Sequence, residues 1–252
     1  MKGHQSGSFR PCPAMKSFFS EKVGCGVFSC NSQDKYSRIT HEIEKKLIKA
    51  IRKRAASQKS FKSINSIILR FPRFKEELKN IKDIFDQYDE DSNGTINHEE
   101  LRNCLSDLHI HLPEEEVDAL YEYCDIDGKE GIQYNEFIVL LCIFHLLMEP
   151  ASASQDISRI GSVKLEATFD TLAEAFAFLD KNGDGKLRRK EVILALNEGS
   201  PREKSPTHIT TKLFKEMDWN KDGKVNFKEF LFALTKWIGF DNDDDDDDEK
   251  ES

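Results

Sequence analysis

The residues best suited to chemistry are acidic and amide side chains that recur in twelve-residue blocks. The blocks open at Asp89, Asp125, Asp180 and Asp218, and a Glu closes each one. Carboxylate and amide oxygens are the ligands that calcium prefers. A calcium loop places them at positions 1, 3, 5 and 12, with a backbone carbonyl at position 7 and a turn-forming glycine at position 6. The spacing therefore indicates calcium coordination.

Three of the blocks fill every position of this pattern, and we name them loops 1, 3 and 4. The predicted metal ligands are Asp89, Asp91, Asn93, Thr95 and Glu100 in loop 1; Asp180, Asn182, Asp184, Lys186 and Glu191 in loop 3; and Asp218, Asn220, Asp222, Lys224 and Glu229 in loop 4. The residue at position 7 contributes its backbone carbonyl. Arg188 at position 9 of loop 3 leaves that ligand to water. The sequence predicts three Ca²⁺ sites.

Loop 2, which runs from Asp125 to Glu136, departs from the pattern. Position 5 is Lys129, which brings an ammonium where an oxygen is needed. Position 6 is Glu130, and holding a non-glycine residue in a left-handed conformation there costs about 1–2 kcal/mol. Gly131 stands one place too late to replace it. We expect this loop to bind calcium weakly or not at all.

The residues around the loops predict helices and a pairing between loops. Apolar side chains stand four residues and one residue before each loop, and others follow each closing Glu, as on the buried faces of an entering and a leaving helix. Position 8 is always aliphatic, and these residues suit short antiparallel pairing within a pair of loops: Ile96, Ile132, Leu187 and Val225. Loop 2 is therefore expected to remain as the structural partner of loop 1.

Loops and flanks together resemble a calmodulin-like EF-hand protein, of the plant type related to the calcium-sensing domain of calcium-dependent protein kinases. The resemblance covers about residues 73–238. It implies an all-α fold: an EF-hand protein with two lobes, each of two paired helix-loop-helix units, and a basic N-terminal helical arm. The predicted divisions are a disordered N-terminus at 1–36, the arm at 37–72, lobes at 73–149 and 165–239 joined by a linker at 150–164, and an acidic disordered tail at 240–252.

The family implies a calcium sensor that opens its helix pairs on Ca²⁺ binding and regulates a protein partner. The alternative is a calcium buffer without a regulated target. A calcium-regulated enzyme is a distant third reading, because no nucleophile–base set or phosphate loop appears outside the EF-hands, and the Gly-rich loop, H-R-D and D-F-G motifs of a kinase are missing. Only Met148 and Met217 lie in the two lobes. Methionine-rich grooves adapt to many targets, so their scarcity predicts a narrow partner range.

Charge divides the chain into a basic arm and an acidic body. Residues 1–75 hold 17 basic and 4 acidic side chains, a net of +13, whereas the whole chain carries −9. The acidic body would repel phosphates, so we expect no nucleic-acid partner. In the segment 38–75, Ile39, Ile43, Leu47 and Ile51 follow helical spacing among 12 basic residues, which is typical of calmodulin targets and membrane-surface helices.

We therefore expect segment 38–75 to serve as an internal target helix that docks in one lobe and that calcium releases or rearranges. Phe61, Ile68 and Phe74 have the spacing of target anchors. The alternative is a solvated helix that extends the first EF-hand. Peripheral membrane contact is the disfavoured reading and needs acylation of Cys12, Cys25 or Cys30. Without a visible signal peptide or transmembrane run, the expected location is cytoplasmic, with the nucleus as the alternative.

Overall fold

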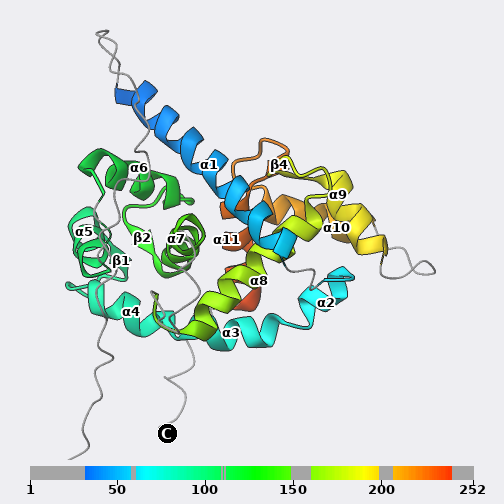
Figure 1. The fold of residues 1–252 in the computed structure, drawn as a ribbon, viewed down its shortest axis with the longest axis horizontal. Coiled ribbons are helices and arrows are strands. Elements are labelled where there is room, and N and C mark those ends of the chain that lie inside the picture. Colours follow the sequence, from blue (N-terminus) through cyan, green and yellow to red (C-terminus); the bar gives the residue numbers. More distant parts are fainter. Residues whose placement is uncertain are drawn as a thin grey trace, which may run out of the picture.

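The computed structural model describes residues 32–57, 61–108, 110, 112–148, 160–198 and 207–239. In these residues the fold is all-α with short two-residue strands, as predicted (Figure 1). The acidic tail, most of the predicted N-terminal disordered segment and most of the predicted linker lie outside the described residues. None of the described helices is long and apolar enough to cross a membrane.

The arm and the residues just after it form three helices. They are α1 (Ser32–Ser57), α2 (Ile64–Ile68) and α3 (Phe71–Lys79). Helix α1 begins at Ser32, inside the segment 1–36 that the sequence predicted to be disordered. The proposed anchors also do not share a helix: Ile68 ends α2 and is exposed, whereas Phe74 lies buried in α3. That anchor spacing is therefore wrong.

The N-terminal lobe pairs two helix-loop-helix units, which we call hands 1 and 2 after their loops. Hand 1 contains α4 (Ile81–Tyr88), β1 (Thr95–Ile96) and α5 (His98–Asp107), and hand 2 contains α6 (Glu114–Cys124), β2 (Ile132–Gln133) and α7 (Tyr134–Leu147). The strands are antiparallel and place Ile96 opposite Ile132, as the position-8 pattern predicted. The Phe85 ring meets Tyr134 and Phe137 edge-on at 5.5 Å, which joins the two hands.

The C-terminal lobe repeats this plan with hands 3 and 4. Hand 3 contains α8 (Val163–Leu179), β3 (Leu187–Arg188) and α9 (Arg189–Glu198), and hand 4 contains α10 (Thr207–Met217), β4 (Lys224–Val225) and α11 (Phe227–Ile238). Leu187 pairs with Val225. Phe176 occupies the place that Phe85 has in the other lobe, and its ring lies 5.2 Å from Phe227 and 5.5 Å from Phe230. The repeated aromatic contacts show that both lobes fold on the same packing rule.

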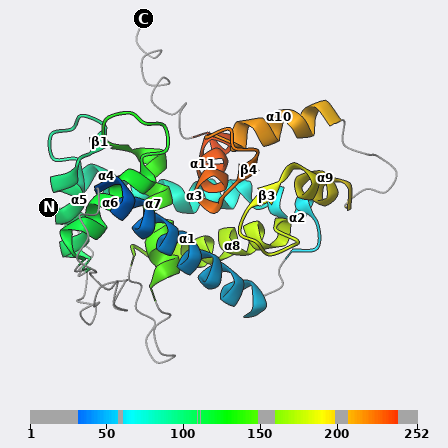
Figure 2. The same cartoon turned by 90° about the horizontal axis from the view of Figure 1, so that it is seen from above.

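The lobes pack against each other in one continuous core. Helix α7 is the centre of this contact, since it packs on α11 and α8 of the C-terminal lobe as well as on its own lobe. Its 14 residues are apolar around most of the helix, which is typical of a helix buried on all sides. Helix α1 then crosses the assembly and packs against α6, α7 and α8 (Figure 2).

The arm was predicted to dock in one lobe, but it packs on both lobes. The buried face of α1, made by Ile43, Leu47 and Ile51, contacts helices of both lobes. Helix α3 packs on α8 and α11 of the C-terminal lobe, and Lys75 Nζ donates to the carbonyl of Gly239 at 3.2 Å. A helix that packs on both lobes buries more apolar surface than docking in one lobe would.

Candidate metal centres

The glutamate at position 12 spans each loop from end to end. In loop 1, one Glu100 oxygen accepts from the amide of Glu90 at 2.9 Å and the other from the amide of Asn97 at 2.8 Å. Glu136 makes the same pair of bonds in its loop, whereas Glu191 and Glu229 accept from the amide at position 3 in place of position 2, and all of them accept from the amide at position 9. The exit helix starts beside each glutamate, so its carboxylate is held facing the loop interior. The glutamate stands at position 12, the position of the bidentate ligand in a calcium loop.

The aspartate at position 1 closes the opposite side of the loop. Asp89 accepts from the amides of Asn93 at 3.0 Å and Gly94 at 2.9 Å. Asp180 accepts from Asp184 at 3.1 Å and Gly185 at 2.8 Å in the same way. These bonds draw the backbone around the carboxylate and build the loop before any ion enters.

The predicted turn at position 6 is confirmed in the three complete loops. Gly94, Gly185 and Gly223 have φ of +82°, +81° and +81°, in the left-handed region that side chains disfavour. Position 4 is also left-handed, and Ser92 and Lys221 occupy it with φ of 54° and 60°. The second turn was not predicted, because position 4 lies outside the ligand pattern, although loop 3 has Gly183 there with φ of +68°.

In loop 1 the structure brings three predicted ligands together. One oxygen from each of Asp89, Asp91 and Glu100 lies within 4.8 Å of the others. The Asn93 side-chain oxygen accepts from the Thr95 amide at 2.8 Å, which keeps it on the inner side of the turn. Hand 1 therefore has a formed acidic cluster with the ligand types that calcium prefers.

Loop 2 also forms an acidic cluster, which the sequence had led us to discount. Oxygens of Asp125, Asp127 and Glu136 gather within 4.8 Å. Lys129 Nζ, however, lies 2.9 Å from an Asp127 oxygen and pairs with it. The lysine thus supplies internally part of the positive charge that an ion would bring. Loop 2 therefore departs from the calcium pattern at position 5, as predicted, because Lys129 pairs with a ligand carboxylate there.

The prediction that Glu130 adopts a strained left-handed conformation is wrong. Loop 2 puts its left-handed residues at Gly128, with φ +68°, and Gly131, with φ +93°, so Glu130 escapes the unfavourable region. The second turn has moved from position 6 to position 7, yet Ile132 still pairs with Ile96. A Cβ on Gly131 would lie 2.5 Å from Thr95 Oγ1, so loop 2 approaches loop 1 more closely than a side chain would permit.

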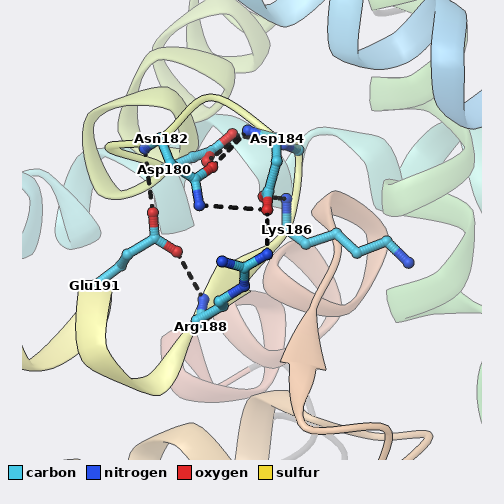
Figure 3. A network of polar contacts seen from close by, with 7 residues as sticks. Asp180, Asn182, Asp184, Lys186, Arg188 and Glu191 are labelled. Atoms are coloured by element: carbon cyan, nitrogen blue, oxygen red, sulfur yellow. Dashed lines mark hydrogen bonds and ion pairs between the residues drawn. The ribbon is translucent and has the colours of Figure 1, made fainter.

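Loop 3 has a feature that spacing alone could not predict (Figure 3). Arg188 Nη2 donates to Asp184 Oδ2 at 2.8 Å, and the Asn182 side-chain nitrogen donates to the same oxygen at 3.2 Å. Arg188 thus occupies a ligand oxygen as well as leaving position 9 to water. The Lys186 side chain extends away from the carboxylates, as expected of a residue that offers its carbonyl. Calcium would have to compete with Arg188 for Asp184.

Burial disfavours the charged form of several loop carboxylates when no cation is bound. Loss of solvent raises the pKa of Asp180 and of Glu229 above the ordinary values for these side chains. The same cause raises the pKa of Asp125 and Glu136 in loop 2. A bound divalent cation would favour the charged forms and reverse this effect.

Hand 4 gives the most direct test of whether the residues fit a metal ion. Asp218 Oδ2 accepts from the Gly223 amide at 3.1 Å, whereas Asp218 Oδ1 is buried and has no hydrogen-bond partner among the described residues. A buried, unpaired carboxylate oxygen costs free energy unless a ligand satisfies it. The oxygen lies at position 1, where calcium binds, so the residues of loop 4 fit the ion. When bound, calcium would supply a positive centre that draws the oxygens of each loop together.

The geometry agrees with comparisons to known proteins. The family of the EF-hand domain pair matches residues 78–141 and 169–235. The chain belongs to the EF-hand family. "Probable calcium-binding protein CML22" of Arabidopsis thaliana is 46% identical over 220 residues, covering 86% of this chain and 96% of the relative. "Probable calcium-binding protein CML21" of the same plant is 47% identical over 202 residues, covering 80% and 87%.

Within the family, the chain is similar to calmodulin-like calcium-binding proteins, which are not enzymes, as the resemblance predicted. A more distant likeness runs to "Calcium-dependent protein kinase 9" of Arabidopsis thaliana, with 30% identity over 134 residues. That match covers 47% of this chain and only 25% of the kinase.

Proposed function

We propose that this protein is a calcium sensor with three working sites, in hands 1, 3 and 4, which changes conformation on Ca²⁺ binding and regulates a protein partner. The observation that carries the proposal is the unpaired Asp218 oxygen in a loop whose other positions all match a calcium loop. The predicted residues of loops 1, 3 and 4 are the proposed ligands. The Lys129–Asp127 pair supports leaving hand 2 out of the count.

The packing of α1 favours a sensor over a buffer. A buffer needs only its loops, whereas here a basic amphipathic helix covers apolar faces of both lobes. Opening of the helix pairs would change the surface on which α1 rests. The arm is thus the proposed internal target, and a partner helix of the same character is the proposed external one.

Calorimetric calcium titration of the full chain and of four matched variants tests the site count. We expect three sites in the native chain, two in each of Glu100→Gln, Glu191→Gln and Glu229→Gln, and an unchanged three in Glu136→Gln. A lost site in Glu136→Gln would refute the exclusion of hand 2.

Far-UV circular dichroism and binding of an apolar dye separate sensor from buffer. We expect both signals to change when calcium is added to the full chain. Calcium uptake with both signals constant would establish a buffer and refute the sensor proposal.

A further inference from the structure

Two α1 side chains, Ile48 and Arg52, lie against loop 3. They stand one helical turn apart and so share a face of α1. A Cβ built on Gly185 at position 6 would overlap the Ile48 side chain, and a Cβ on Gly183 would lie 3.4 Å from Arg52 Nη2. The arm therefore contacts the backbone of a candidate calcium loop directly.

The other complete loops have no such cover. A Cβ on Gly94 in loop 1 or on Gly223 in loop 4 would meet no described atom within 4 Å. These glycines occupy the same position 6 and have nearly the same φ as Gly185. The contact with α1 is thus particular to hand 3 and is not a general property of the loop.

A second contact fastens α1 beside the same hand, and we call it the Arg54 clamp. Arg54 Nε donates to Asp170 Oδ1 at 2.7 Å, and its other nitrogens donate to the carbonyls of Leu146 at 2.8 Å and His145 at 3.0 Å. His145 Nε2 also lies 2.9 Å from Asp170 Oδ1. Asp170 is on α8, which enters loop 3, and the carbonyls are at the end of α7. The clamp therefore ties α1 to both lobes.

We propose that α1 is a latch controlled by hand 3: calcium in loop 3 weakens the docking of α1, and docked α1 weakens calcium binding to loop 3. This rests on the proposed function, since it requires hand 3 to bind calcium. The cause is electrostatic and steric. A divalent ion enters beside the Arg52 guanidinium, and loop closure around the ion moves the glycine backbone on which Ile48 rests. Reciprocity follows because coupling between two binding equilibria is one free energy.

Hydrogen exchange of the full chain, read by mass spectrometry on peptides from residues 43–54, tests the latch. Calcium should speed exchange in this segment by at least about fivefold, the lower end of typical coupling between sites. Glu191→Gln, which disables hand 3, should abolish the response. Glu100→Gln and Glu229→Gln, which disable hands 1 and 4, should retain it. A response that persists undiminished in Glu191→Gln overturns the proposal.

The reverse direction is tested with Arg52→Gln and its matched control Lys53→Gln. Both variants remove one positive charge from the exposed side of α1. Lys53 points about 100° away from Arg52 around the helix, so it serves as the control. Calcium affinity of hand 3, followed by nuclear magnetic resonance at the Gly185 amide, should rise about two- to fivefold more in Arg52→Gln, as expected for one partly screened charge. Equal affinities in the two variants overturn the latch.

The experiments separate failure of the latch from failure of the sensor. Calcium that alters exchange in the lobes while residues 43–54 stay constant overturns the latch and leaves the sensor standing. Calcium that alters exchange in no segment, with constant dye binding and circular dichroism, overturns both.

Discussion

Arg188 should limit the calcium affinity of hand 3, and Arg188→Asn should relieve that limit. The Asp184 oxygen that would bind calcium is 2.8 Å from Arg188 Nη2. Adding a calcium–oxygen distance of about 2.4 Å puts the two positive centres about 5 Å apart. Coulomb's law gives about 1.7 kcal/mol of repulsion in bulk water at that distance, and salt and side-chain motion reduce it to about 1 kcal/mol. The substitution should therefore lower the dissociation constant of hand 3 about fivefold.

Asparagine is the informative replacement because loops 1 and 4 already have it at position 9. Asn97 and Asn226 cap α5 and α11, and the Asn226 side chain accepts from the Glu229 amide at 3.0 Å. A similar cap on α9 should stabilise the folded chain by about 1 kcal/mol. The substitution therefore has two separate effects, a higher calcium affinity and a higher melting temperature in the calcium-free chain.

The assay is calcium titration followed at the Gly185 amide, with Lys190→Asn as the control. Lys190 carries the same charge two residues along the chain but lies outside the pair with Asp184. If Arg188→Asn raises the melting temperature without changing the calcium affinity of hand 3, then the repulsion argument is wrong. If Lys190→Asn raises the affinity equally, then general charge and not the Asp184 contact is responsible.

Three further substitutions test other parts of the structure. Burial would raise the pKa of Asp170, but its two basic partners hold that pKa below the ordinary value. Asp170 therefore contributes stability that is present above about pH 4 and lost as pH falls through its folded pKa. Asp170→Asn should cost about 1 kcal/mol at neutral pH, and the difference from the native chain in urea unfolding should shrink in acid. Gly131→Ala should destabilise the N-terminal lobe by about 2 kcal/mol, because it adds left-handed strain and a contact with Thr95; an unchanged urea midpoint would contradict this. Lys129→Asp alone should leave three calcium sites in calorimetry, whereas Lys129→Asp with Glu130→Gly should give four; a fourth site in the single variant would show that the shifted turn does not matter.

The helices and loops could be predicted because calcium coordination fixes residue types at fixed spacing. Position 8 even predicted the pairing of Ile96 with Ile132. The Arg188–Asp184 pair could not be predicted in the same way, since it depends on the conformation of a long side chain. The relocated turn at Gly131 was also missed, because the sequence analysis held loop 2 to the register of the others. The backbone of loop 2 passes so close to Thr95 that only glycine fits there, and this places the turn at position 7 in loop 2.

The position of the arm on both lobes could not be predicted from the sequence either. The spacing of Ile43, Leu47 and Ile51 predicted a buried helix face, which the structure confirms. Which helices cover that face depends on how the lobes meet, and α7 decides this by packing on both. The apolar composition of α7 was visible in the sequence, but it does not say which neighbours surround a helix buried on all sides.

The contact between the two lobes also gives loop 2 a structural role, although Lys129 stands at one of its ligand positions. Lys228 next to the position-12 glutamate of hand 4 reaches across the lobes, and its Nζ donates to the Tyr123 carbonyl at 2.6 Å. That carbonyl lies in the last turn of α6, two residues before Asp125 opens loop 2. Any shift of Glu229 on binding calcium would therefore move a residue bonded to hand 2. Because hand 2 is paired by β2 to loop 1, it lies physically between two candidate calcium sites. Its own Lys129–Asp127 pair places positive charge inside loop 2, and in this structure hand 2 connects hand 1 to hand 4.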